Sequence, residues 1–219
     1  MTRPVALITA VSAALVLAAC SSPAEPGATA ASSPSPSASA SASTAPTSEA
    51  IVIGAETLAV VAADGQTREF DYFDDREAAI EALTTVLGEP RQEPAETDGS
   101  EPVRYDWGGF VLTDQVGDGD REGYSTDYSV TASAASVGGV PIRTVDGVAV
   151  GDPFAEIDAS DGDAPEEHLD ADTGTSFTWA RVDVVALDGL HDGANVGVAL
   201  TGSGDVVEEV DAPAANFGE

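Results

Sequence analysis

One stretch limits which part of this chain can fold. In residues 21–49, 26 of 29 positions are Ser, Ala, Pro or Thr. This composition offers too little apolar area to offset the entropy lost on ordering the chain, so we expect 20–49 to be a disordered tether. The foldable remainder, 50–219, has the size of one ordinary domain.

The negative charge is concentrated in that remainder. The chain holds 39 Asp and Glu against 8 Arg and no Lys, for a formal net charge of −31. All the acids except Glu25 and Glu49, and all the Arg except Arg3, fall within it. Nucleic acids and anionic lipid headgroups are bound through Lys and Arg, so this charge argues against both as direct partners of the domain.

The first 19 residues have the pattern of an export signal. Arg3 supplies a short positive region, and Val5–Ala19 is an apolar run too short for a comfortable membrane span. The run ends in Leu17-Ala18-Ala19-Cys20, which resembles the lipobox of bacterial lipoproteins, and the only Cys of the chain stands where that motif requires it. A secretory signal with an incidental Cys is the alternative.

The lipobox resemblance implies a location. In lipoproteins the Cys thiol receives diacylglycerol, the signal is cut before the Cys, and the new amine is acylated in turn. For this chain the resemblance implies lipidation of Cys20 and anchoring on the extracytoplasmic face of the cell membrane. With a single Cys the chain forms no internal disulfide. It resembles the short, Ala- and Asp-rich lipoproteins of high-GC Gram-positive bacteria.

Valine dominates the large apolar residues of 51–219, which favours sheet. A hairpin is predicted from the apolar run at 58–61, the turn residues Asp64-Gly65, and Phe70 and Tyr72 at alternating positions. We therefore predict an α+β fold, mainly antiparallel sheet with one or two short helices.

One helix is predicted after the hairpin. Asp74 and Glu77 have the spacing of a capping box, apolar residues then recur at helical spacing, and Gly88 offers the C-terminal cap. Further strands are predicted at 103–112, 128–132, 142–150, 177–187, 196–200 and 206–210. A turn is predicted at Asp146-Gly147.

A loose internal repeat accompanies this pattern. Asp75, Ile80 and Trp107 correspond to Asp152, Ile157 and Trp179 if the second loop is five residues shorter. The two copies would span 55–136 and 137–219. Residues 144–152 are similar to the segment that opens tandem helix-plus-sheet repeats in the β-lactamase inhibitor protein and in outer-membrane assembly lipoproteins.

Two acidic clusters are candidate cation sites. Asp118, Asp120 and Glu122 resemble the opening of an EF-hand calcium loop, with Asp127 nearby, but Ser129 stands where the closing Glu belongs. The second cluster is Asp158, Asp161, Asp163, Glu166, Glu167, Asp170 and Asp172. We interpret both as solvated loops, with weak divalent-cation binding, chiefly of Ca²⁺, as the alternative.

The remaining candidates are His and aromatic residues. His168 and His191 fall in predicted acidic loops, which favours surface positions over catalysis. Trp107 and Trp179, with Tyr105 and Phe177, are candidates for a platform that stacks a sugar or a peptide. Core positions are the favoured alternative, because both Trp residues lie in alternating strand patterns.

These observations predict a membrane-anchored extracytoplasmic lipoprotein with a non-catalytic domain that binds an envelope protein or a small ligand, or that organises the envelope. The alternatives are a domain that responds to divalent cations and a small extracytoplasmic hydrolase. No zinc-protease, nucleophile-elbow or phosphate-loop motif is present in the sequence.

Overall fold

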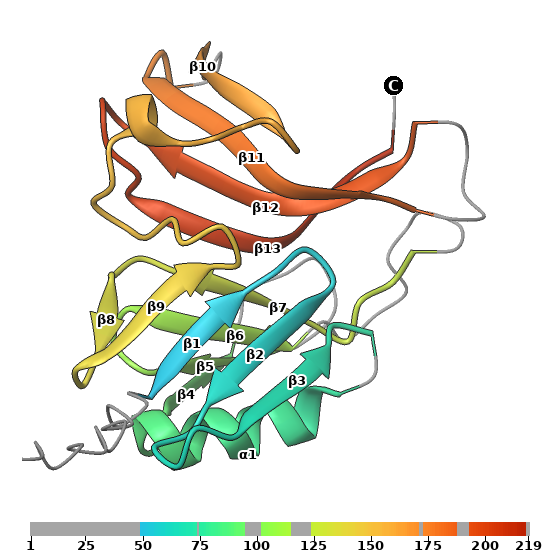
Figure 1. Cartoon of the computed structure of the whole chain (residues 1–219), viewed down its shortest axis with the longest axis vertical. Helices are drawn as coiled ribbons and strands as arrows, with labels where there is room; N and C mark the ends of the chain where they lie inside the picture. The colour runs from blue at the N-terminus through green and yellow to red at the C-terminus, as the bar shows by residue number, and fades with distance from the viewer. Residues whose placement is uncertain are drawn as a thin grey trace, which may run out of the picture. The chain divides into compact units, whose positions relative to one another are not determined.

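The computed structural model describes residues 49–73, 75–94, 102–114, 124–170, 173–187 and 193–217 (Figure 1). The fold is mainly β, with two sheets, one α-helix and one short 3₁₀ helix among these residues. It is the predicted α+β class. The signal and the tether at 1–48, including Cys20, lie outside the described residues.

The larger sheet has eight antiparallel strands. In spatial order they are β10 (Asp163–Leu169), β11 (Ser176–Ala186), β12 (Asn195–Gly202), β13 (Glu209–Asn216), β7 (Tyr128–Ala132), β6 (Phe110–Asp114), β5 (Val103–Asp106) and β4 (Arg91–Pro94). The chain thus contributes two runs of four consecutive strands. These runs meet where β7 pairs with β13, with Val210 opposite Ala132.

The smaller sheet is mixed. Its spatial order is β3 (Thr67–Asp71), β2 (Thr57–Val61), β1 (Ala50–Ile53), β9 (Val140–Thr144) and β8 (Ser136–Val137). The predicted hairpin is confirmed, because β2 and β3 pair antiparallel around Asp64-Gly65 and Gly65 has φ +81°. The central strand β1 runs parallel to β9, with Ile51 opposite Ile142.

The helix α1 (Arg76–Leu87) lies beside β2 and β3 (Figure 1). It buries Ala79, Ala82 and Leu83, and it ends at Gly88, whose N–H donates to the Thr84 carbonyl. The predicted cap, Asp74, lies outside the described residues. Asp75 directly precedes the helix and makes no side-chain hydrogen bond to its first turn.

One continuous core joins the two sheets and the helix. Tyr72 at the end of the small sheet is fully buried against Tyr128 of β7, with ring centroids 5.1 Å apart. The Tyr128 hydroxyl donates to the Phe70 carbonyl at 3.2 Å, and the Tyr72 hydroxyl donates to the Gly54 carbonyl at the same distance. The sheets therefore form a single folded unit.

Three sequence predictions are corrected by the strand boundaries. The predicted strand at 103–112 is two strands, because Gly108 and Gly109 adopt positive φ and form a two-residue turn between β5 and β6. The predicted strand at 142–150 ends at Thr144. The acidic segment Asp163–Leu169 is strand β10 rather than a loop, because β11 supplies backbone partners for it.

The two four-strand runs differ in what precedes them. The first follows the twelve-residue helix α1, whereas the second follows the three-residue 3₁₀ helix η1 (Phe154–Glu156). Trp107 lies between β5 and β6 of the first run, and Trp179 lies within β11 of the second. The internal repeat itself stays a prediction.

Candidate functional site

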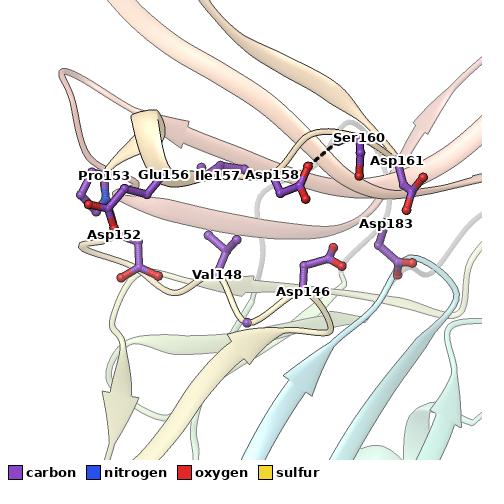
Figure 2. Close-up of a pocket in the computed structure, with 11 residues that line it drawn as sticks. Asp146, Val148, Asp152, Pro153, Glu156, Ile157, Asp158, Ser160, Asp161 and Asp183 are labelled. Carbon is purple, nitrogen blue, oxygen red and sulfur yellow. Dashed lines mark hydrogen bonds between the residues drawn. The ribbon is translucent and has the colours of Figure 1, made fainter.

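A pocket of about 400 Å³ opens between the segment that links β9 to β10 and the strand β11. Six carboxylates line it, and none of the described residues around it is basic: the acids are Asp146, Asp152, Glu156, Asp158, Asp161 and Asp183. Figure 2 shows Asp146 and Asp152 on one side, with Asp158 and Asp161 facing them from the segment that leads to β10. We call this the acidic pocket.

Asp146 lies at the tip of a tight turn that the sequence predicts from Asp146-Gly147. Gly147 has φ +86°, and its N–H donates to the Thr144 carbonyl at 3.0 Å. The Thr144 hydroxyl accepts a hydrogen bond from the Val148 N–H at 3.1 Å, and the Thr144 N–H donates to the Val148 carbonyl at 2.8 Å. These hydrogen bonds close the turn on both sides and so fix the backbone at Asp146.

Asp152 is held against the connection between β12 and β13. Its Oδ2 accepts a hydrogen bond from the Ala149 N–H at 2.8 Å, and its carbonyl accepts one from the Val207 N–H at 2.9 Å. Pro153 forms an isolated bridge with Val206. The wall of the pocket that carries Asp152 is therefore attached to the large sheet.

Asp183 reaches the pocket because β11 is bulged. The register with β12 shifts between Val182 and Val185, and Asp183 is the one non-glycine residue with positive φ (+51°) in the part of the chain that is described. A bulge reverses the side on which a residue projects. Asp183 Oδ2 accepts a hydrogen bond from the Ala55 N–H of the small sheet at 2.7 Å.

Burial and neighbouring carboxylates raise the pKa of Asp146 above its ordinary value. The carboxylates that contribute are those of Asp183, Asp161 and Asp158. Like charges at close range disfavour the ionised form, so the pocket carries negative charge that no side chain of the pocket neutralises. Within the described residues, no three His, Cys, Asp or Glu side chains are placed to hold a metal ion together.

Trp107 and Tyr105 belong to the core of the domain. Trp107 is 8% exposed, its indole N–H donates to the Gly88 carbonyl at 2.8 Å, and its ring lies against Phe110. Tyr105 is half-buried and packs against the same core. The indole of Trp107 thus closes the C-terminal end of α1 onto the large sheet.

Trp179 is in a different environment. It is half-buried in β11, with the guanidinium of Arg181 5.5 Å from its ring centroid and the ring of His168 perpendicular to it at 5.9 Å. His168 also stacks on Phe177 at 5.6 Å. The prediction that His168 lies in a loop was wrong. His191 lies outside the described residues.

The calcium-loop prediction falls almost entirely on residues that are not described. Asp118, Asp120 and Glu122 belong to them. Asp127 is described, and its backbone N–H donates to the Tyr72 carbonyl at 2.7 Å. Its backbone is therefore used to join β7 to the end of the small sheet.

Sequence reasoning found part of the acidic pocket. It marked Asp146 as a turn residue, and it placed Asp158 and Asp161 in an acidic cluster. It missed Asp183, which lies inside an apolar strand pattern and enters the pocket only through the bulge. A charged residue in the middle of Val182–Val185 is the one signal that would have marked it.

Among the described residues, no helix is both long and apolar enough to span a membrane. Comparison of the chain with protein-family models, with curated protein sequences and with solved structures finds no significant match in any of the three.

Proposed function

We propose that this chain is a lipid-anchored protein of the extracytoplasmic face of the cell membrane, whose domain is a non-catalytic module that binds a positively charged group of an envelope partner in the acidic pocket. The unneutralised carboxylates of the pocket are the observation that carries the binding part of the proposal.

The anchor is supported by the sequence. The lipobox places the only Cys of the chain at the lipidation position, and the segment after it has the composition of a tether. One acyl chain gives only marginal membrane binding, whereas two or three give a stable anchor at about 0.8 kcal/mol per buried CH₂. A strongly acidic domain gains nothing from an anionic membrane surface, so the acyl chains would be its whole attachment.

Binding of a cation is supported by the electrostatics of the pocket. Burial and like charge already raise the pKa of Asp146, so an ammonium or guanidinium group would relieve repulsion as well as form charge-assisted hydrogen bonds. Val148 and Ile157 line the same pocket and offer apolar contacts to the carbon chain that bears the cation.

The anchor is tested by fractionating cells that express the full chain or its Cys20→Ala variant. We expect the wild-type protein in the membrane fraction and the variant in the soluble or secreted fraction. A variant that stays in the membrane fraction as fully as the wild type would show that Cys20 is not the attachment point.

The binding part is tested by calorimetry on the full-length lipoprotein in a nonionic detergent, with spermidine as the probe. The variant Asp146→Asn/Asp158→Asn removes two charges from the pocket. The matched control Glu77→Gln/Glu81→Gln removes two exposed charges from α1. We expect the pocket variant to weaken spermidine binding by about tenfold and the control to leave it nearly unchanged. Equal losses in both variants would mean that spermidine responds only to net charge.

A further inference from the structure

A group of stacked rings lies on the large sheet, away from the acidic pocket. His168 of β10 stacks on Phe177 of β11 with 24° between the ring planes, and its ring also meets that of Trp179. The register explains the contact, because His168 lies opposite Phe177 and Glu166 lies opposite Trp179. We call His168, Phe177 and Trp179 the aromatic ladder.

The aromatic ladder is on the face of the sheet that is turned away from the core. Ala180 and Val182 of β11 are buried in the core, so strand alternation places Phe177 and Trp179 on the other face. Outward positions of a half-buried sheet are usually polar. Here they carry two aromatic rings that are partly exposed, next to an exposed His.

The position of Trp179 is fixed by a buried arginine. Arg181 is 3% exposed, and its Nη2 and Nε lie 2.6 and 2.7 Å from Oδ2 of Asp163. Its Nη1 donates to the Asn195 side-chain carbonyl at 2.7 Å, and its guanidinium lies over the Trp179 ring. The ladder is therefore held in place before any ligand arrives, which lowers the entropy cost of binding.

The charge around the ladder is negative. Arg181 is the only Lys or Arg in 151–219, and Asp163 already neutralises it. Glu166, next to Trp179 across the strands, is exposed and has no cationic partner among the described residues. Glu209 is also exposed, opposite Thr201, and Thr201 lies opposite Trp179 on its other side.

From these observations we propose that the aromatic ladder and Glu166 form a docking site for an arginine side chain in a basic segment of a partner protein. A guanidinium stacks on aromatic rings and pairs with carboxylates at the same time, which an ammonium does less well. Arg181, with Trp179 and Asp163, makes the same combination of contacts within the chain. Charge complementarity selects this occupant over a neutral sugar ring, which the aromatic rings alone would also accept.

This surface is separate from the acidic pocket. The pocket is lined by residues of the 146–161 connection and by Asp183, and none of them belongs to the aromatic ladder. The inference therefore goes beyond the proposed function, and either one can fail without the other.

The test uses NMR of the ¹⁵N-labelled full-length lipoprotein in nonionic detergent. The chain contains two Trp, so two indole N–H signals are expected, and Trp179→Phe assigns them. The probe is an acetylated and amidated peptide of alternating Arg and Ala, with the same peptide carrying citrulline in place of Arg as its neutral control. We expect the Arg peptide to shift the Trp179 signal and to leave that of Trp107, which is bonded to Gly88, in place.

Two substitutions complete the test. Glu166→Gln changes an exposed position and is expected to keep the fold, and Phe177→Leu removes one ring. Each substitution is expected to weaken binding of the Arg peptide about three- to tenfold. Glu81→Gln, at an exposed position on α1, is expected to leave the affinity unchanged. The proposal is overturned if the citrulline peptide or chitotriose shifts the Trp179 signal as much as the Arg peptide does. It is equally overturned if millimolar Arg peptide shifts neither signal, or if Glu81→Gln weakens binding as much as Glu166→Gln does.

Discussion

The two four-strand runs of the large sheet resemble each other in order but not in how their core-facing sides are closed. A twelve-residue helix precedes the first run, and Trp107 fills the space between that helix and the sheet. A three-residue 3₁₀ helix precedes the second run, and the acidic pocket opens beside it. The two runs thus differ both in the length of the helix that precedes them and in whether the space beside that helix is filled.

The two tryptophans also differ in their burial and in their contacts. Trp107 is buried and its N–H is bonded to the end of α1, whereas Trp179 is half-buried on the outer face and covers Arg181. Equivalent residue types in similar strand patterns therefore serve packing in one half and present a surface in the other.

The largest expected effect comes from truncating the two tryptophans in turn. Trp107→Ala leaves a cavity between α1 and the large sheet, and we expect it to lower the free energy of unfolding by about 3–5 kcal/mol. Trp179→Ala removes a partly exposed ring and one cation–π contact, with an expected loss of about 1–2 kcal/mol. Urea unfolding followed by circular dichroism measures both. Equal losses of unfolding free energy in the two variants would contradict the conclusion that Trp107 is a core residue and Trp179 a surface residue.

The second half depends on close backbone contacts in place of a helix. A Cβ at Gly202 would collide with the Val206 carbonyl oxygen and press on the ring of Phe154, whereas a Cβ at Gly204 meets nothing. We expect Gly202→Ala to cost about 1–3 kcal/mol and Gly204→Ala to change stability little. Thermal melts of the two variants measure this difference. An unchanged melting temperature for Gly202→Ala would mean that the connection between β12 and β13 can shift to make room for the added methyl group.

The contact between Asp183 and Ala55 tests how tightly the small sheet is coupled to the second half. Asp183→Ala leaves the Ala55 N–H without its acceptor, so we expect a loss of about 1–2 kcal/mol. Asp183→Asn keeps an acceptor oxygen and removes a negative charge, so it should cost less. Hydrogen exchange at the Ala55 amide reports the contact directly. An amide that stays equally protected in Asp183→Ala would argue against this coupling.

The smallest expected effect is a dependence of stability on pH. An acid with a higher pKa in the folded chain than in the unfolded chain holds its proton better when folded, so stability falls as the pH rises from about 3.8 through the folded pKa. Asp146→Asn should therefore raise the melting temperature at pH 7, and the gain should vanish near pH 3, at about the ordinary pKa of Asp or below. Glu81→Gln on α1 is the control. A lower melting temperature for Asp146→Asn at pH 7 would contradict the assigned charge repulsion.

Local signals in the sequence account for much of the fold. The Asp64-Gly65 turn between alternating apolar residues predicted the hairpin, and helical spacing with Gly88 predicted α1. The same local signals failed for segment 163–169, which was predicted to be a loop and is strand β10. Its carboxylates and Pro165 disfavour a strand locally. Pairing with β11 and stacking of His168 on Phe177 are long-range contacts that a single segment does not reveal.

The site was less predictable than the fold for the same reason. Asp183 enters the acidic pocket through a register shift, and strand alternation alone would have given it no role there. Trp107 lies in the core and Trp179 lies on the outer face of the large sheet, and the residues around each Trp do not specify which face it takes. Composition marked the charge of the domain but not where that charge converges.

The parallel pairing of β1 with β9 has a consequence for how the domain forms. β1 is the first strand of the domain and lies in the middle of the small sheet, yet its partner β9 ends at Thr144. A chain that emerges from its N-terminus onward must therefore keep β1 half-paired until most of the domain has been released. Such distant pairings slow folding. The export proposed above would need the chain to stay unfolded until it has crossed the membrane, and a late pairing of β1 with β9 fits that need.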